Sequence, residues 1–115
     1  MKTELTPEQS GHLIKLGVPR EKASGVKKEG HWDYGEYDYH YWTVFTLIDL
    51  LNILPNELLG DYNRIIESTN EYHLVYYHNG VDEEYLVSVH ETELIDALYK
   101  IIELLLKNKF LIWNT

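Results

Sequence analysis

The chain of 115 residues has the length of one domain, contains no cysteine and carries a formal net charge of −9. The absence of cysteine excludes thiol catalysis, disulfides, iron–sulfur clusters and cysteine-based zinc sites, and a hydrophobic content of 44% is that of a folded globular domain. No apolar run approaches the roughly 18 residues of a membrane span, and the first residues lack a signal-peptide pattern, so we expect a single cytoplasmic domain over residues 1–115 with no membrane contact.

The charges are distributed unevenly along the chain. Residues 1–30 contain six Lys/Arg and four Asp/Glu, whereas residues 31–106 contain fifteen Asp/Glu and only Arg64 and Lys100 as basic residues. An acidic body repels phosphate, so nucleic-acid binding, which needs clustered Lys and Arg, is disfavoured. This charge suits solubility or a basic partner.

Residues 1–30 are predicted to be a region of short helices. Thr6 is a candidate N-cap, Pro7 would occupy the first helical position, and Gln9 completes a capping box with Thr6. Between Pro19 and Gly25 the chain can add one or two helical turns. The glycines and alternating charges of "GVKKEG", residues 25–30, then predict a loop.

The segment 31–45 contains the most unusual stretch of the chain, "HWDYGEYDYHYW", which holds six aromatic rings, three carboxylates and two imidazoles. From Gly35 onward aromatic and polar residues alternate, so an extended backbone would place Tyr37, Tyr39 and Tyr41 on one face. Two interpretations stay open: the rings cover the sheet or the following helix, or they form an interaction surface. The candidate interaction surface comprises Trp32, Tyr34, Tyr37, Tyr39 and Tyr41.

The rest of the chain predicts a helix, a β-meander and a second helix. Residues 46–55 are apolar on most sides, which predicts a buried helix with Thr46 as its N-cap and Asp49 as a capping carboxylate. Residues 61–89 alternate with a period of two and contain an Asn-Gly turn, which predicts three antiparallel strands, with the aromatic segment as a possible fourth. Residues 91–108 carry one apolar stripe and form the clearest helix of the chain.

The fold class predicted is therefore α+β, with the C-terminal amphipathic helix packed on the sheet. On the outer side of that helix, Asp96 and Lys100 are four residues apart, as are Glu103 and Lys107, and both pairs are expected to interact. The apolar tail, residues 110–115, needs either the core or a neighbouring chain to cover it.

Few residues are candidates for chemistry. On a strand, His31 and Asp33 could lie on one face, as could Asp38 and His40. His31, Asp33 and His40 are the candidate metal ligands, but none of the six histidines has a known metal-ligand spacing. No serine lies in a Gly-x-Ser-x-Gly elbow, and no glycine-rich phosphate loop is present. We therefore predict no catalytic residue, no cofactor and no metal, and enzymatic activity is disfavoured.

Three blocks of the sequence carry a resemblance. They are "LTPEQSGHLIKLGVPREKASG", "VFTLIDLLNILP" and "ETELIDALYKIIELLLKN". Together they are similar to a group of short uncharacterised bacterial proteins that accompany phage-derived and other mobile-element genes. The resemblance implies an α+β domain and a phage or prophage origin, and it carries over no activity, cofactor or catalytic residue.

The hypothesis favoured by these observations is a small, acidic, non-enzymatic protein-interaction module, such as a phage accessory protein. Its partner would be an unidentified protein or a second copy of the chain, joined through the tail or the aromatic segment. The alternative is a small-ligand or metal-binding domain, including a hydrolytic one, that uses His31, Asp33 and His40.

Overall fold

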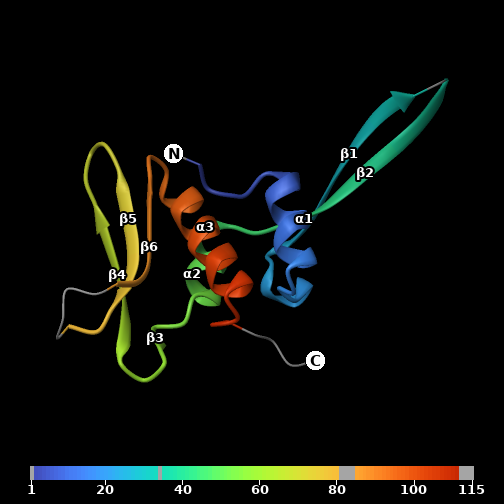
Figure 1. Ribbon diagram of the computed structural model, residues 1–115. Helices are drawn as coiled ribbons and strands as arrows, with labels where there is room; N and C mark the ends of the chain where they lie inside the picture. Colours follow the sequence, from blue (N-terminus) through green and yellow to red (C-terminus); the bar gives the residue numbers. More distant parts are fainter. Residues whose placement is uncertain (1, 34, 81–84, 112–115) are drawn as a thin grey trace.

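The computed structural model describes residues 2–33, 35–80 and 85–111, and for residues 31–33, 37 and 38 it describes the backbone only. The described chain is α+β and contains two antiparallel sheets, one of two strands in the order β1-β2 and one of four strands in the order β3-β4-β5-β6 (Figure 1). The elements are α1 (Pro7–Lys15), the 3-10 turn η1 (Arg20–Lys22), β1 (Gly25–Asp33), β2 (Glu36–Val44), α2 (Leu47–Ile53), β3 (Glu57–Leu58), β4 (Tyr62–Ser68), β5 (His73–His78), β6 (Tyr85–Glu91) and α3 (Leu94–Lys107).

The α+β class, the N-terminal helix and the C-terminal helix packed on a sheet are confirmed. At α1, the Thr6 hydroxyl accepts from the Gln9 backbone N–H at 3.2 Å, and the Gln9 side chain accepts from the Thr6 N–H at 3.0 Å. This capping box, with Pro7 in the first turn, fixes where the helix begins. Both signals are local, which is why they could be interpreted from the sequence.

The predicted strand count is wrong. The three-stranded meander exists as β4, β5 and β6, but its fourth strand is the two-residue β3, in which Leu58 pairs with Tyr62. The aromatic segment instead pairs with residues 25–30, for which a loop was predicted. Aromatic and β-branched residues form stabilising pairs with the residues opposite them on a neighbouring strand. The aromatic strand β2 therefore pairs with residues 25–30, although the glycines and lysines of that segment do not by themselves favour a strand.

The helix predicted over 46–55 spans Leu47–Ile53 and is buried on one side only. Leu50 is fully buried, whereas Ile48 is 67% exposed. The seven-residue helix packs one stripe against α3, so its other side faces outward despite being apolar. Its C-terminal carbonyls are satisfied by Arg64, whose Nη1 donates to the backbone oxygens of Leu51 and Leu54 at 3.1 and 3.2 Å.

Helix α3 lies between the sheet and α1 and forms the centre of the core (Figure 1). It begins at Leu94 rather than at residue 91, because Glu91 still belongs to β6. On the sheet, the face that includes Val75 and Tyr77 is buried against the helices, as the period of two predicts. The fully buried residues of α3 are Ile95, Ala97, Leu98, Ile101, Ile102 and Leu105.

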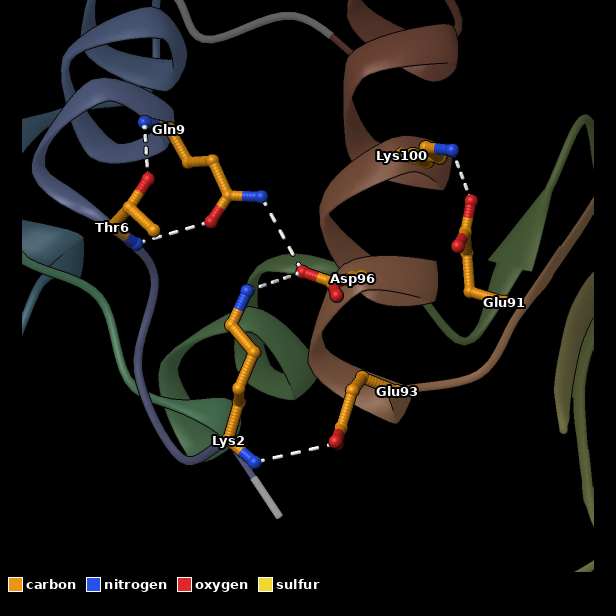
Figure 2. A network of polar contacts seen from close by, with 7 residues as sticks. All are labelled: Lys2, Thr6, Gln9, Glu91, Glu93, Asp96 and Lys100. Atoms are coloured by element: carbon orange, nitrogen blue, oxygen red, sulfur yellow. Dashed lines mark hydrogen bonds and ion pairs between the residues drawn. The ribbon is translucent and has the colours of Figure 1, made fainter. Parts of the chain in front are cut away.

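Polar contacts join the N-terminal segment to α3 (Figure 2). Lys2 Nζ donates to Asp96 Oδ1 at 2.9 Å, and Gln9 Nε2 approaches the same oxygen at 3.4 Å. The predicted Asp96–Lys100 pair is not in direct contact, since Lys100 binds Glu91 at the end of β6. The pKa of Lys100 is raised mainly by that hydrogen bond and to a lesser degree by the charge of Asp96. Partners from other elements lie closer to both side chains than their helical neighbours do.

The second predicted helical pair is confirmed, with Lys107 Nζ 3.5 Å from Glu103 Oε1. Beyond α3, the first two residues of the tail, Phe110 and Leu111, are half-buried and pack against the core. The remainder of the predicted tail, 112–115, lies outside the described residues. Among the described helices, none has both the length and the apolar character needed to cross a membrane.

Candidate functional site

The most distinctive feature of the structure is a hairpin, β1–β2, which we call the arm (residues 25–44). Its strands pair continuously from Gly25–Val44 at the base to Asp33–Glu36 at the tip. Gly35, with φ of +80°, allows the tight turn between them. The arm projects away from the body, and within the described residues neither strand pairs with any strand but the other (Figure 1).

One face of the arm carries exposed apolar and aromatic side chains. In the antiparallel register, Val26, Lys28, Tyr39 and Tyr41 occupy this face. Val26 is 67% exposed, Tyr39 43% and Tyr41 65%, and the two tyrosine rings lie 6.4 Å apart. Lys28 Nζ lies 5.0 Å from the centroid of the Tyr39 ring, a cation–π contact. Tyr39 and Tyr41 therefore do not cover the core.

The other members of the predicted interaction surface can be placed only in part. The backbone register pairs Trp32 with Tyr37 near the tip, at positions on the same face of the ladder as positions 39 and 41. The side chains of Trp32 and Tyr37, and all of Tyr34, lie outside the described residues. The sequence predicted a shared face for the tyrosines of β2, but it missed that β1 would contribute a second strand.

The base of the arm is joined to the body by polar contacts from two different segments, η1 and the N-terminal residues. Arg20 Nη1 donates to Thr43 Oγ1 at 3.1 Å, and Lys27 Nζ lies 2.7 Å from Glu4 Oε1. A shallow pocket of about 290 Å³ lies between α1 and β2 at this point. Its lining residues are Pro7, Gly11, Ile14, Arg20, Tyr41, Trp42 and Thr43.

Charge changes sign along the arm. The basic residues Lys27 and Lys28 lie near the base. From residue 29 to residue 40 the sequence has four carboxylates and no Lys or Arg. The distal half of the arm is thus acidic and aromatic, a composition that favours basic, partly apolar surfaces.

The backbone register places the candidate metal ligands His31, Asp33 and His40 on one face of the arm, opposite the face of Tyr39 and Tyr41. The side chains of His31 and Asp33 lie outside the description, and the register pairs His31 with Asp38 and His40 with Glu29. Across residues 2–33, 35–80 and 85–111, no three His, Asp or Glu side chains that are described form a group able to hold a metal ion. The small-ligand or metal-binding alternative stays a prediction.

A second aromatic surface was missed in the sequence. On the side of the four-stranded sheet that faces away from the helices, the rings of Tyr72 and His90 lie 4.5 Å apart, and Tyr85 lies 5.0 Å from Tyr76 and 5.2 Å from His78. Burial by these neighbours, followed by the hydrogen bond from its hydroxyl to Glu67, raises the pKa of Tyr76. The alternation in "EYHLVYYH" places Tyr72 and Tyr76 on one face, but the rings of β6 join them only through strand pairing.

In comparisons with known proteins, no family model matches the chain, and no curated protein and no solved structure matches it significantly. The geometry of the arm is therefore the basis for a functional proposal.

Proposed function

We propose that the chain is a small protein-interaction module whose arm docks onto a basic, partly apolar surface of a partner protein. The observation that carries the proposal is the exposure of Tyr39, Tyr41 and Val26 on a two-stranded ladder. Within the described residues this ladder pairs with no other strand, and it contacts α1 and the N-terminal segment. Without an assigned relative, this proposal rests on physical chemistry alone.

An arm of this kind gains little from the core of its own domain. A two-stranded hairpin is marginally stable in water, because no third layer covers its side chains. Exposed aromatic residues on such a ladder lose their contact with water when a partner covers them, and tyrosine is among the residues that contribute most to interface affinity. Binding of a partner to the exposed face would therefore also stabilise the arm.

The chemistry of the arm selects the kind of partner. The carboxylates of residues 29–40 and the adjacent tyrosines suit arginine, which forms bidentate carboxylate contacts and stacks on aromatic rings. The same carboxylates repel phosphate, so a nucleic acid does not fit this surface. The resemblance implies a phage or prophage origin, and we propose on this chemistry that the chain is an accessory protein that binds a host or phage protein.

The test is affinity capture from a lysate of the source organism, followed by titration of each captured protein against purified chain. The test variant is the double substitution Tyr39→Ala, Tyr41→Ala, and the matched control is Ile48→Ala, which removes an apolar side chain that is 67% exposed on α2. We expect the arm variant to weaken binding at least tenfold and the control to leave it unchanged, with binding that weakens as salt is added.

All three proteins must first be shown by circular dichroism to be folded. If the arm variant binds every captured protein as tightly as the unmodified chain does, the arm is not the docking surface and the proposal is wrong. If capture by the control is lost instead, the exposed side of α2 is the binding surface.

A further inference from the structure

The outer face of the four-stranded sheet, opposite the helices, forms a surface distinct from the arm. Helix α3 contacts β5 and β6 on the inner face, and none of the described elements lies over the outer one (Figure 1). The outer face is aromatic, since Tyr72, Tyr76 and Tyr85 emerge there beside two imidazoles. Tyr76 is only 9% exposed because the neighbouring side chains surround its ring, so the aromatic side chains of this face pack against one another.

The strand register arranges the outer face in three rows that run across β4, β5 and β6. Residues directly opposite in antiparallel strands share a face, and β5 is the middle strand of the three. The rows are Glu67–Leu74–His90, Ile65–Tyr76–Ser88 and Asn63–His78–Tyr85.

Charge is scarce on this face. Among its described residues only Glu67 has a formal charge, and its Oε1 accepts a hydrogen bond from the Tyr76 hydroxyl at 3.0 Å. Residues 31–106 as a whole contain fifteen carboxylates, so this is a weakly charged area on an acidic body. Depletion of charge with enrichment of tyrosine is the compositional signature of an interface core. It offers little to a basic partner and lowers the repulsion between two copies of the chain.

We propose that two copies of this chain pack these outer faces together, related by a two-fold axis that runs along β5. Such an axis places β4 of one copy over β6 of the other. Glu67 then faces the second copy's His90, Leu74 faces Leu74, and Tyr76 faces Tyr76. Packed sheets lie about 10 Å apart, which Glu and His side chains can span together.

Of the two face-to-face arrangements, only this one brings Glu67 over an imidazole. Rotation about an axis across the strands would bring Glu67 over Asn63 and Leu74 over His78 instead. With the axis along β5, the residues Leu74, Tyr76 and His78 of the middle strand each meet their own counterpart, while Ile65 faces Ser88 and Asn63 faces Tyr85. The proposal does not depend on the arm, which projects from the other side of the molecule (Figure 1).

The test is sedimentation equilibrium of the full chain and of variants in which the charge of Glu67 or of its proposed partner His90 is changed. We expect the unmodified chain to give a dimer of twice the 13.6 kDa chain mass. His90→Glu places two carboxylates together at both symmetric contacts, and Glu67→Lys removes the carboxylate that faces His90 at both contacts. Each should therefore raise the dissociation constant at least tenfold. A mixture of the two variants should form a heterodimer, because the carboxylate introduced at position 90 of one chain would face the ammonium group introduced at position 67 of the other.

Asn52→Glu, at an exposed position of α2, adds the same negative charge away from the sheet and is the control. It should leave the dimer unchanged. The double arm variant Tyr39→Ala, Tyr41→Ala should also remain dimeric, which separates this interface from the proposed function. A chain that is monomeric at every concentration, an equal loss in Asn52→Glu and His90→Glu, or a mixture of variants that stays monomeric would each overturn the proposal. Dimer loss in the arm variant alone would place the contact between arms instead.

Discussion

Ser24 Oγ donates a hydrogen bond of 2.6 Å to Asp49 Oδ2, and this contact joins the residue before β1 to the first turn of α2. The same Asp49 oxygen accepts from the Thr46 backbone N–H at 2.8 Å, completing the capping box of α2. Because α2 packs on α3, the contact couples the base of the arm to the core. One carboxylate thus caps a short helix and anchors a hairpin.

Substitution of Asp49 should destabilise the whole domain more than substitution of its partner. We expect Asp49→Ala to lower the free energy of unfolding by about 0.5–2 kcal/mol, as for loss of a helix cap, and Ser24→Ala by about 1 kcal/mol, as for one hydrogen bond. Urea denaturation followed by circular dichroism measures both. Equal, negligible effects would mean that the two hydrogen bonds contribute nothing to stability.

Tyr77 should make stability fall at alkaline pH. Its hydroxyl donates to the Pro55 backbone oxygen at 2.6 Å, and burial raises its pKa to about 12 although the Arg64 charge lowers it. An unfolded tyrosine ionises near pH 10. The folded-state pKa is therefore the higher one, so the contribution of Tyr77 is complete below about pH 10 and is lost as the pH rises through about 12.

The test of this dependence is urea denaturation of the unmodified chain and of Tyr77→Phe across that alkaline range. The variant should be less stable at neutral pH by about 1 kcal/mol for the lost hydrogen bond, but its stability should fall less steeply above pH 10. Tyr99, whose pKa burial also raises to about 12, will retain part of the slope. Parallel curves for the two proteins would rule out Tyr77 as a source of the alkaline loss.

Neighbouring aromatic residues should differ sharply in their effect on stability. Tyr41 is 65% exposed on the arm, whereas Phe45, just beyond β2, is fully buried in the core. We expect Tyr41→Ala to change the free energy of unfolding by less than about 0.5 kcal/mol and Phe45→Ala to lower it by about 3–5 kcal/mol. Thermal or urea unfolding distinguishes these outcomes, and a large effect at Tyr41 would show that its ring is structural.

The Lys2–Asp96 contact should contribute weakly and in a salt-dependent way. Both side chains are partly exposed, at 38% and 24%, so solvent screens their attraction. Asp96→Asn should lower the free energy of unfolding by no more than about 1 kcal/mol at low salt and by less at high salt. Glu71→Gln, at an exposed position between β4 and β5, removes the same charge and is the matched control. An effect that persists unchanged in high salt would point to hydrogen bonding instead.

Local chemistry made several elements predictable. The capping boxes at Thr6 and Thr46 and the apolar stripe of α3 each involve residues within one or two helical turns, so their structure follows from neighbours in the chain. The same holds for the alternation along β5, which predicts that Val75 and Tyr77 share one face; the structure shows that this face is the buried one. The six strands were predicted only in part, because β1 contains two glycines and adjacent lysines that are typical of a loop.

The sequence by itself determined the fold class, the helix starts, the faces of β5 and the presence of an acidic, aromatic segment, because each of these depends on short-range spacing or composition. Only the tertiary structure decided that residues 25–30 pair with the aromatic strand to form the arm, that Asp96 binds Lys2, and that Glu67, Tyr76 and His90 share one face of the sheet. These contacts join residues far apart in the chain. Strand register and packing set them, and neither is encoded in any local pattern.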